Sequence, residues 1–141
     1  MTKIAHKVFA ASLLMSCSYT AAAELVVVVN KENPVEQLSL TNVIDIYTGR
    51  YMAFPNGTSA EPVDLPNESS YKENFYFQAT GLSLAKINSY WARLKFTGRY
   101  LPPIELDTPS DALKYVQKNP NAVAYVDEQY VTDKVKVVYR F

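Results

Sequence analysis

The sequence predicts one α/β domain with a central, mainly parallel sheet flanked by helices. A continuous run of apolar, largely β-branched residues, 24–30, is typical of a strand buried on both faces. Short apolar runs of this kind alternate with longer segments in which apolar residues recur at helical spacing. No repeat or linker divides the 141 residues. Alternating strands and helices are typical of layered α/β domains.

The first helix is predicted over 40–48. Ser39 is a good N-cap for it, and Gly49 can end it in a left-handed conformation. The next predicted strand covers 61–65, where apolar and polar residues alternate, and Pro66 ends it.

Two consecutive helices are predicted in the middle of the chain. Ser69 or Ser70 caps the first, and Gly81 ends it. Ser83 caps the second, which covers 84–96 and has an apolar stripe at helical spacing.

The last third of the chain contains three short predicted strands and one helix. The strands cover 104–106, 122–126 and 135–139. Thr108 is an N-cap with proline at the first helical position, which predicts a helix over 109–119.

Residues 1–23 have the layout of a secretory signal peptide. Lys3 and Lys7 give a positive start, 8–16 is apolar, and 21–23 is a run of alanines suited to cleavage. The alternative is an amphipathic N-terminal helix of the folded domain. A signal peptide predicts a secreted, periplasmic protein.

Cleavage after Ala23 leaves a mature domain of residues 24–141. The segment from Leu14 to Cys17 also resembles a lipoprotein processing site, in which Cys17 would carry the lipid, although Met15 fits that site poorly. Lipid attachment at Cys17 is therefore the alternative to cleavage after Ala23.

The composition of the mature domain excludes several classes of function. His6 and Cys17 are the chain's only histidine and cysteine, and both precede residue 24. The domain therefore has no Ser-His-Asp triad, cysteine nucleophile or disulfide, and no His- or Cys-ligated metal. No cofactor and no metal site is predicted, and oxygen-only calcium loops of the D-x-D-x-D-G type are absent from the sequence.

Charge argues against a nucleic-acid partner. Cleavage removes Lys3 and Lys7 from the 14 basic residues and none of the 14 acidic ones, which gives a net charge of −2. No dense run of Lys and Arg is present.

An enzyme is not predicted. Paired carboxylates could serve a glycosidase, but no pair is singled out by spacing, and solvated charges and helix caps explain them. They are Asp45, Asp64, Glu68, Glu73, Asp107, Asp111, Asp127 and Glu128. The numerous tyrosines either fill the core or form a contact surface. We expect at least half of the aromatic groups at 75–77 and 90–91 to be core.

One helix start has the features of an anion site. The segment 66–72 follows a predicted strand and opens a helix, and helix N-termini at the carboxyl ends of strands present free N–H groups. Two hydroxyls, from Ser69 and Ser70, and the charge of Lys72 could hold an oxyanion there. The alternative is that one of the serines is simply an N-cap.

Several motifs together resemble the periplasmic phosphate-binding proteins of ABC transporters, including their short single-lobe relatives. The resemblance covers about residues 30–140. It rests on Asn33-Pro34, Ser39-Leu40, Ile46-Tyr47-Thr48-Gly49-Arg50, Pro62-Val63, Ser69-Ser70, Phe75, Tyr90-Trp91, Phe96-Thr97-Gly98-Arg99, Pro102-Pro103 and Asn119 to Val126.

This resemblance implies a single periplasmic-binding-protein-like lobe that binds a small oxyanion such as phosphate for an ABC-type uptake system. It places Ser69 and Ser70 at the ligand-facing helix start and Lys72 near a position where arginine is usual. Two departures matter. Glu68 would repel an anion beside the site, and one lobe cannot bury most of a ligand's surface.

Two functions therefore remain. The domain binds the oxyanion, either as a homodimer that completes a cleft or by passing ligand to a membrane transporter. Alternatively, it has lost the ligand and acts through protein contacts, as an accessory domain of a membrane sensor.

Overall fold

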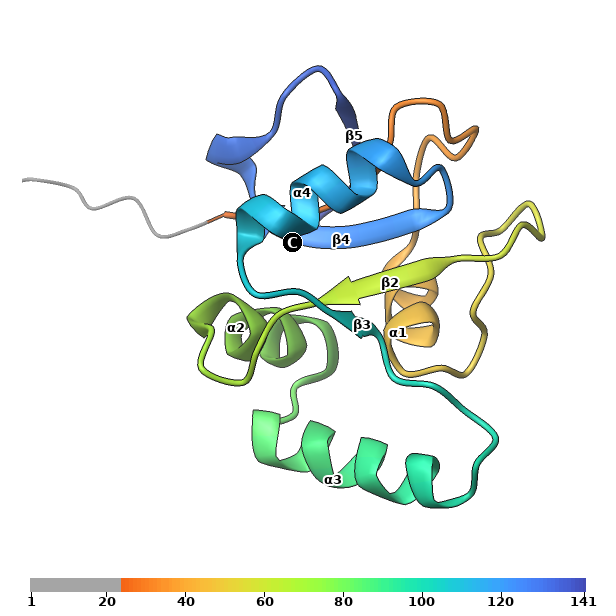
Figure 1. Ribbon diagram of the computed structural model, residues 1–141, viewed down its shortest axis with the longest axis vertical. Coiled ribbons are helices and arrows are strands. Elements are labelled where there is room, and N and C mark those ends of the chain that lie inside the picture. The colour runs from red at the N-terminus through yellow and green to blue at the C-terminus, as the bar shows by residue number, and fades with distance from the viewer. Residues whose placement is uncertain (1–23) are drawn as a thin grey trace, which may run out of the picture.

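The computed structural model describes residues 24–141, in which five strands form one sheet in the order β3-β2-β4-β1-β5 (Figure 1). The strands are β1 (Leu25–Asn30), β2 (Glu61–Asp64), β3 (Ile104–Glu105), β4 (Ala122–Asp127) and β5 (Val135–Arg140). β2 pairs in parallel with β3 and β4, whereas β1 pairs antiparallel with β4 and β5. Four strands therefore run in one direction and β1 runs in the other. The α/β class is confirmed, with a mixed sheet.

The helices start and end close to their predicted bounds. They are α1 (Leu40–Tyr47), α2 (Ser70–Thr80), α3 (Leu84–Phe96) and α4 (Pro109–Lys118). The short 3-10 turn η1 (Glu128–Tyr130) was not predicted. Within residues 24–141, no helix has the length and apolar character needed to cross a membrane. The predicted signal peptide and Cys17 lie outside the described residues.

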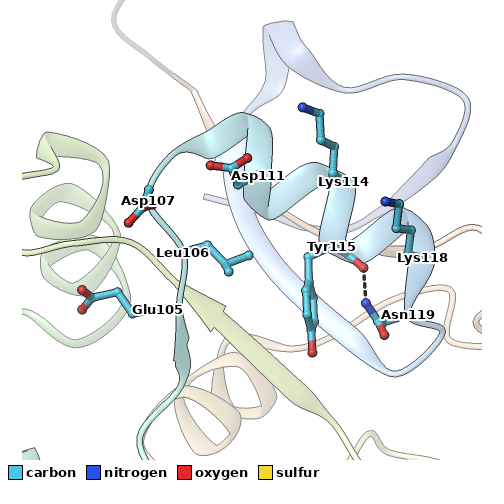
Figure 2. Close-up of a pocket in the computed structure, with 8 residues that line it drawn as sticks. All are labelled: Glu105, Leu106, Asp107, Asp111, Lys114, Tyr115, Lys118 and Asn119. Carbon is cyan, nitrogen blue, oxygen red and sulfur yellow. Dashed lines mark hydrogen bonds between the residues drawn. The ribbon is translucent and has the colours of Figure 1, made fainter.

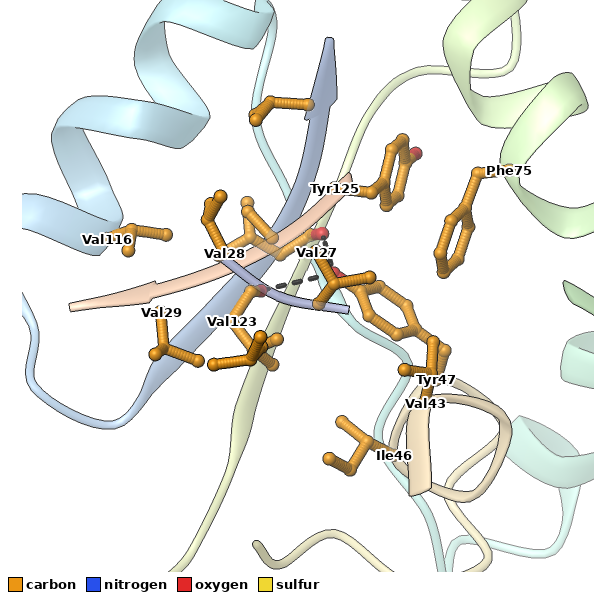
Figure 3. Packing of buried hydrophobic residues seen from close by; sticks show 14 of the residues in the cluster. Val27, Val28, Val29, Val43, Ile46, Tyr47, Phe75, Val116, Val123 and Tyr125 are labelled. Atoms are coloured by element: carbon orange, nitrogen blue, oxygen red, sulfur yellow. Dashed lines mark hydrogen bonds between the residues drawn. The ribbon is translucent and has the colours of Figure 1, made fainter. Parts of the chain in front are cut away.

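The helices cover both faces of the sheet. α4 packs on one face, where Val116 meets the valines of β1, and α1 packs on the other through Val43 and Ile46 (Figure 3). α2 joins α1 on that second face, and α3 packs on α2 as an outer helix. Because helices lie over both faces, β1 is buried along its whole length although it is antiparallel to its neighbours.

Aromatic residues form the part of the core between the sheet and α2. The rings of Phe75 and Tyr125 stack with centroids 4.0 Å apart, and Tyr47 meets Phe75 edge-on at 4.6 Å. The buried Tyr47 hydroxyl donates to the carbonyl oxygens of Val63 and Val123, on β2 and β4. The tyrosines of this region therefore belong to the core and join the two strands.

The aromatic groups singled out in the sequence divide as expected. In the first group Phe75 and Tyr76 are buried, whereas Phe77 is exposed. In the second group Trp91 is buried and Tyr90 is partly buried against the core. The expectation that at least half of each group is core is confirmed.

Candidate functional site

The carboxyl ends of β2, β3 and β4 lie along one edge of the sheet, because these strands are parallel. The chain leaves them toward α2, α4 and η1 respectively. We call this side of the molecule the carboxyl edge. It brings the N-termini of α2 and α4 to the side of the sheet where ligands bind in open α/β folds.

The start of α2 differs from the starts of the other α-helices. Ser39, Ser83 and Thr108 each accept a hydrogen bond from a backbone N–H in the first turn of their helix. Ser69 occupies the same N-cap position of α2 with an extended backbone, but its side chain makes no capping hydrogen bond. The Ser69 hydroxyl is therefore not used to cap α2.

Backbone donors add to this hydroxyl. The first N–H groups of any helix have no partner within the helix. Among the described residues, the N–H groups of Ser70 and Tyr71 make no backbone hydrogen bond outside the helix either. Ser70 is exposed and Ser69 is partly exposed. The structure thus brings both predicted serines to a helix start with open donors.

A pocket of about 360 Å³ adjoins this start at the carboxyl edge. Its lining comes from the first turn of α2, from the first turns of α4 and from η1. The residues are Tyr71, Thr108, Pro109, Ser110, Leu113 and Tyr130. Loss of hydration raises the pKa of Tyr71, and the negative charge of Asp127 raises it further. The Tyr71 hydroxyl therefore stays protonated and can donate a hydrogen bond.

Asp64, the last residue of β2, is the centre of a buried polar cluster behind the start of α2. Its carboxylate accepts hydrogen bonds from the Tyr76 hydroxyl at 2.7 Å, from the Leu65 N–H at 2.8 Å and from the Tyr125 hydroxyl. Burial raises the pKa of both tyrosines, and the Asp64 charge raises it further. Both hydroxyls therefore remain donors to the carboxylate.

Lys72 belongs to this cluster and not to the exposed start of the helix. The residue is only 6% exposed. Its Nζ lies 3.6 Å from Asp64 Oδ2 and 3.9 Å from Glu105 Oε2. The predicted arrangement of Ser69, Ser70 and Lys72 is thus divided, with the serines at the surface and the Lys72 charge balanced by two carboxylates.

Lys72 also lines a second cavity, of about 470 Å³, between α3, β2 and β3. Trp91 lines it too, and the Trp91 Nε1–H is buried without a hydrogen-bond partner among residues 24–141. Lys95 of α3 and Glu105 of β3 contribute charges of opposite sign. No single sign of charge dominates this cavity.

A third depression, of about 480 Å³, runs along α4 (Figure 2). Its charged lining residues are the carboxylates Glu105, Asp107 and Asp111 and the lysines Lys114 and Lys118. The Tyr115 hydroxyl donates to Glu61 at 2.7 Å, and this hydrogen bond is the main cause that raises the Tyr115 pKa to about 12. Charges of both signs therefore line this depression, and it has no excess of positive charge to bind an anion.

Metal binding has no support in the part of the chain that the structure describes. Residues 24–141 contain no group of three or more His, Cys, Asp or Glu side chains placed to hold a metal ion.

The fold is similar to that of one lobe of several solved substrate-binding proteins. Three solved structures align with 82–83% of this chain. A putative phosphate ABC transporter substrate-binding protein from Clostridium perfringens, with bound phosphate, has a TM-score of 0.67 and 22% identity. An ABC-type phosphate transport receptor from Vibrio cholerae has a TM-score of 0.65 and 21% identity. PstS from Borrelia burgdorferi has a TM-score of 0.62 and 11% identity.

These alignments cover only 44%, 45% and 47% of the three longer chains, in the same order. This chain therefore spans less than half of their length, as a single lobe does. No protein-family model matches the sequence, and no curated protein matches it. The predicted resemblance to phosphate-binding proteins is confirmed at the level of the fold.

Proposed function

We propose that the domain binds a small oxyanion at the start of α2, and that this oxyanion is phosphate. The observation that carries this proposal is the Ser69 hydroxyl, which occupies the N-cap position without capping the helix. Together with the Ser70 hydroxyl and the open N–H groups of Ser70 and Tyr71, it supplies neutral donors at the positive end of a helix dipole.

Similarity of fold supports the choice of phosphate. The structure from C. perfringens contains bound phosphate, and the V. cholerae and B. burgdorferi proteins are a phosphate transport receptor and PstS. Their lobe architecture is shared by this chain. The proposal extends their ligand to this domain, as a periplasmic solute-binding protein of an ABC-type uptake system.

Lys72 has an indirect role in this account. Its charge is balanced by Asp64 and Glu105, so neutral donors provide most of the binding. The Asp64–Lys72 pair instead fixes the loop between β2 and α2, which carries Ser69 and leads directly into Ser70 at the start of α2. Exposed Glu68 reduces the affinity for the anion, because its negative charge repels it. A second copy of the chain would complete the cleft that one lobe leaves open.

Isothermal titration calorimetry with phosphate tests the proposal. We expect binding to the wild-type protein and at least a tenfold loss in Ser69→Ala/Ser70→Ala, about the effect of one lost hydrogen bond to a charged group. Ser89→Ala is the matched control, because Ser89 is an exposed serine in the interior of α3. Equal affinity in all three proteins would contradict the site.

Absence of phosphate binding by the wild-type protein at millimolar concentration would contradict the proposed ligand. It would favour the alternative function, a lobe that has lost its ligand and serves as an accessory domain through contacts with a membrane sensor or other protein.

A further inference from the structure

One end of the molecule carries apolar side chains that are almost fully exposed. α3 lies at one end of the long axis of the molecule, and β5 and α4 lie toward the other end (Figure 1). At the end of α3, Phe96 is 95% exposed, and Leu101 in the following loop is 79% exposed. Every residue from 95 to 101 is exposed. Isolated apolar residues are common on surfaces, so these two side chains mark a contact site only together with the charge of the same segment.

The same segment is basic, although the domain as a whole is weakly acidic. Residues 74–104 contain Lys86, Arg93, Lys95 and Arg99, and none of the chain's 14 acidic residues. Three of these four basic residues are within three positions of Phe96 in the sequence. The total charge is close to neutral, but positive and negative residues are unevenly distributed along the chain.

We propose that this end of the molecule docks on a membrane surface rich in anionic phospholipid. The contact is the α3 tip, defined as Arg93, Lys95, Phe96, Arg99 and Leu101. Phe96 and Leu101 enter the boundary between headgroups and acyl chains, as the apolar side chains of interfacial segments do. The three basic residues, which are exposed and close to Phe96 in the sequence, bind the anionic headgroups.

The shape of the α3 tip favours a membrane over a protein partner. A protein interface has a well-packed apolar core inside a polar rim. Phe96 and Leu101 instead project from a helix end and a loop, each next to a basic residue or within two residues of one. Fluid lipid accommodates separate projecting side chains without a complementary pocket.

The proposal is independent of phosphate binding, because the α3 tip and the α2 start share no residue. A protein that docks through the α3 tip would lie beside a membrane partner whether or not its carboxyl edge holds a ligand.

Vesicle co-sedimentation of the full chain tests the proposal. Vesicles of phosphatidylcholine alone are compared with vesicles that also contain phosphatidylglycerol. We expect binding only to the anionic vesicles, with a decrease at high salt. Phe96→Ala/Leu101→Ala should lower the affinity at least about tenfold, and Lys95→Gln/Arg99→Gln about fivefold per charge. Circular dichroism verifies that each variant is folded.

Phe77→Ala is the matched control, because Phe77 is 62% exposed on α2 and no basic residue lies within four positions of it in the sequence. It should bind as the wild type does. Every variant keeps residues 1–23, so differences between variants report on the α3 tip. Equal binding by the wild type and the Phe96/Leu101 variant overturns the proposal. Retention on polyglutamate resin without any vesicle binding also overturns it and identifies an acidic protein as the partner.

Discussion

The Lys72 ammonium and the Asp64 carboxylate form a buried ion pair behind the start of α2, with Nζ 3.6 Å from Oδ2. Their side chains are 8% and 7% exposed. This pair links the end of β2 to the first turn of α2. The loop between them carries Ser69, so the geometry of the candidate anion site depends on two residues that need not touch the anion.

Asp64→Asn is expected to destabilise the protein by about 3 kcal/mol, because it leaves the buried Lys72 without its main counter-charge. Urea unfolding measures the loss. The control is Asp45→Asn, which removes a surface pair with Arg50 at 3.6 Å and should cost less than about 1 kcal/mol. Equal losses in the two variants would contradict a structural role for the buried pair.

Stability is expected to fall in alkaline solution. Burial raises the pKa of Tyr47, Tyr76 and Tyr125, and Asp64 raises each further. In the unfolded chain these groups ionise near pH 10. Above about pH 10 the folded protein therefore holds more protons than the unfolded chain, and stability decreases as the pH rises.

Urea midpoints measured from pH 8 to pH 11 test this dependence. The midpoint should be steady up to about pH 9 and fall beyond it. Tyr76→Phe should make the fall shallower, because one of the buried phenols no longer contributes. A midpoint that does not change over this range would show that the tyrosines are not buried as described.

The two N-cap serines Ser69 and Ser39 are expected to differ in their effect on stability. Ser39→Ala removes a capping box with Asn42 and should cost about 1 kcal/mol. Ser69→Ala removes a hydroxyl that makes no capping hydrogen bond and should cost less than about 0.5 kcal/mol. Thermal unfolding of both variants without phosphate measures the difference. A larger loss for Ser69→Ala would mean that Ser69 is an ordinary cap.

Gly49 should tolerate a side chain less well than Gly57. Both have positive φ, at 71° and 86°, so alanine costs about 1 kcal/mol or more at each. A Cβ at Gly49 would also lie 3.0 Å from the Trp91 ring, whereas a Cβ at Gly57 would have no atom within 4 Å. Chemical unfolding of the two alanine variants should show the larger loss at Gly49. Equal losses would contradict the packing of Trp91 against this turn.

The local signals in the sequence were sufficient to predict the helices and strands. Serine and threonine caps, apolar spacing and the β-branched run determine where elements begin and end, and the structure follows them closely. The direction of β1 has no such local signal. The run 24–30 is buried because helices cover both faces of the sheet, so the same residues suit a parallel or an antiparallel strand.

The candidate site was predictable only in part. Ser69 and Ser70 could be placed at a helix start because a cap follows a strand there. The pairing of Lys72 with Asp64 was not predicted, since a lysine next to two serines gives no sign that it points into the protein. Tyr125 is 61 residues from Asp64 in the sequence, and only the tertiary fold brings them together.

Phosphate titration of the ¹⁵N-labelled protein tests the central claim, anion binding at the α2 start, most directly. The account predicts that the amide signals of Ser69, Ser70 and Tyr71 shift most, saturate with phosphate, and lose this response in Ser69→Ala/Ser70→Ala. Shifts confined to other parts of the chain, such as the basic residues Lys95 and Arg99, would contradict the claim. So would the absence of any saturable shift at the start of α2.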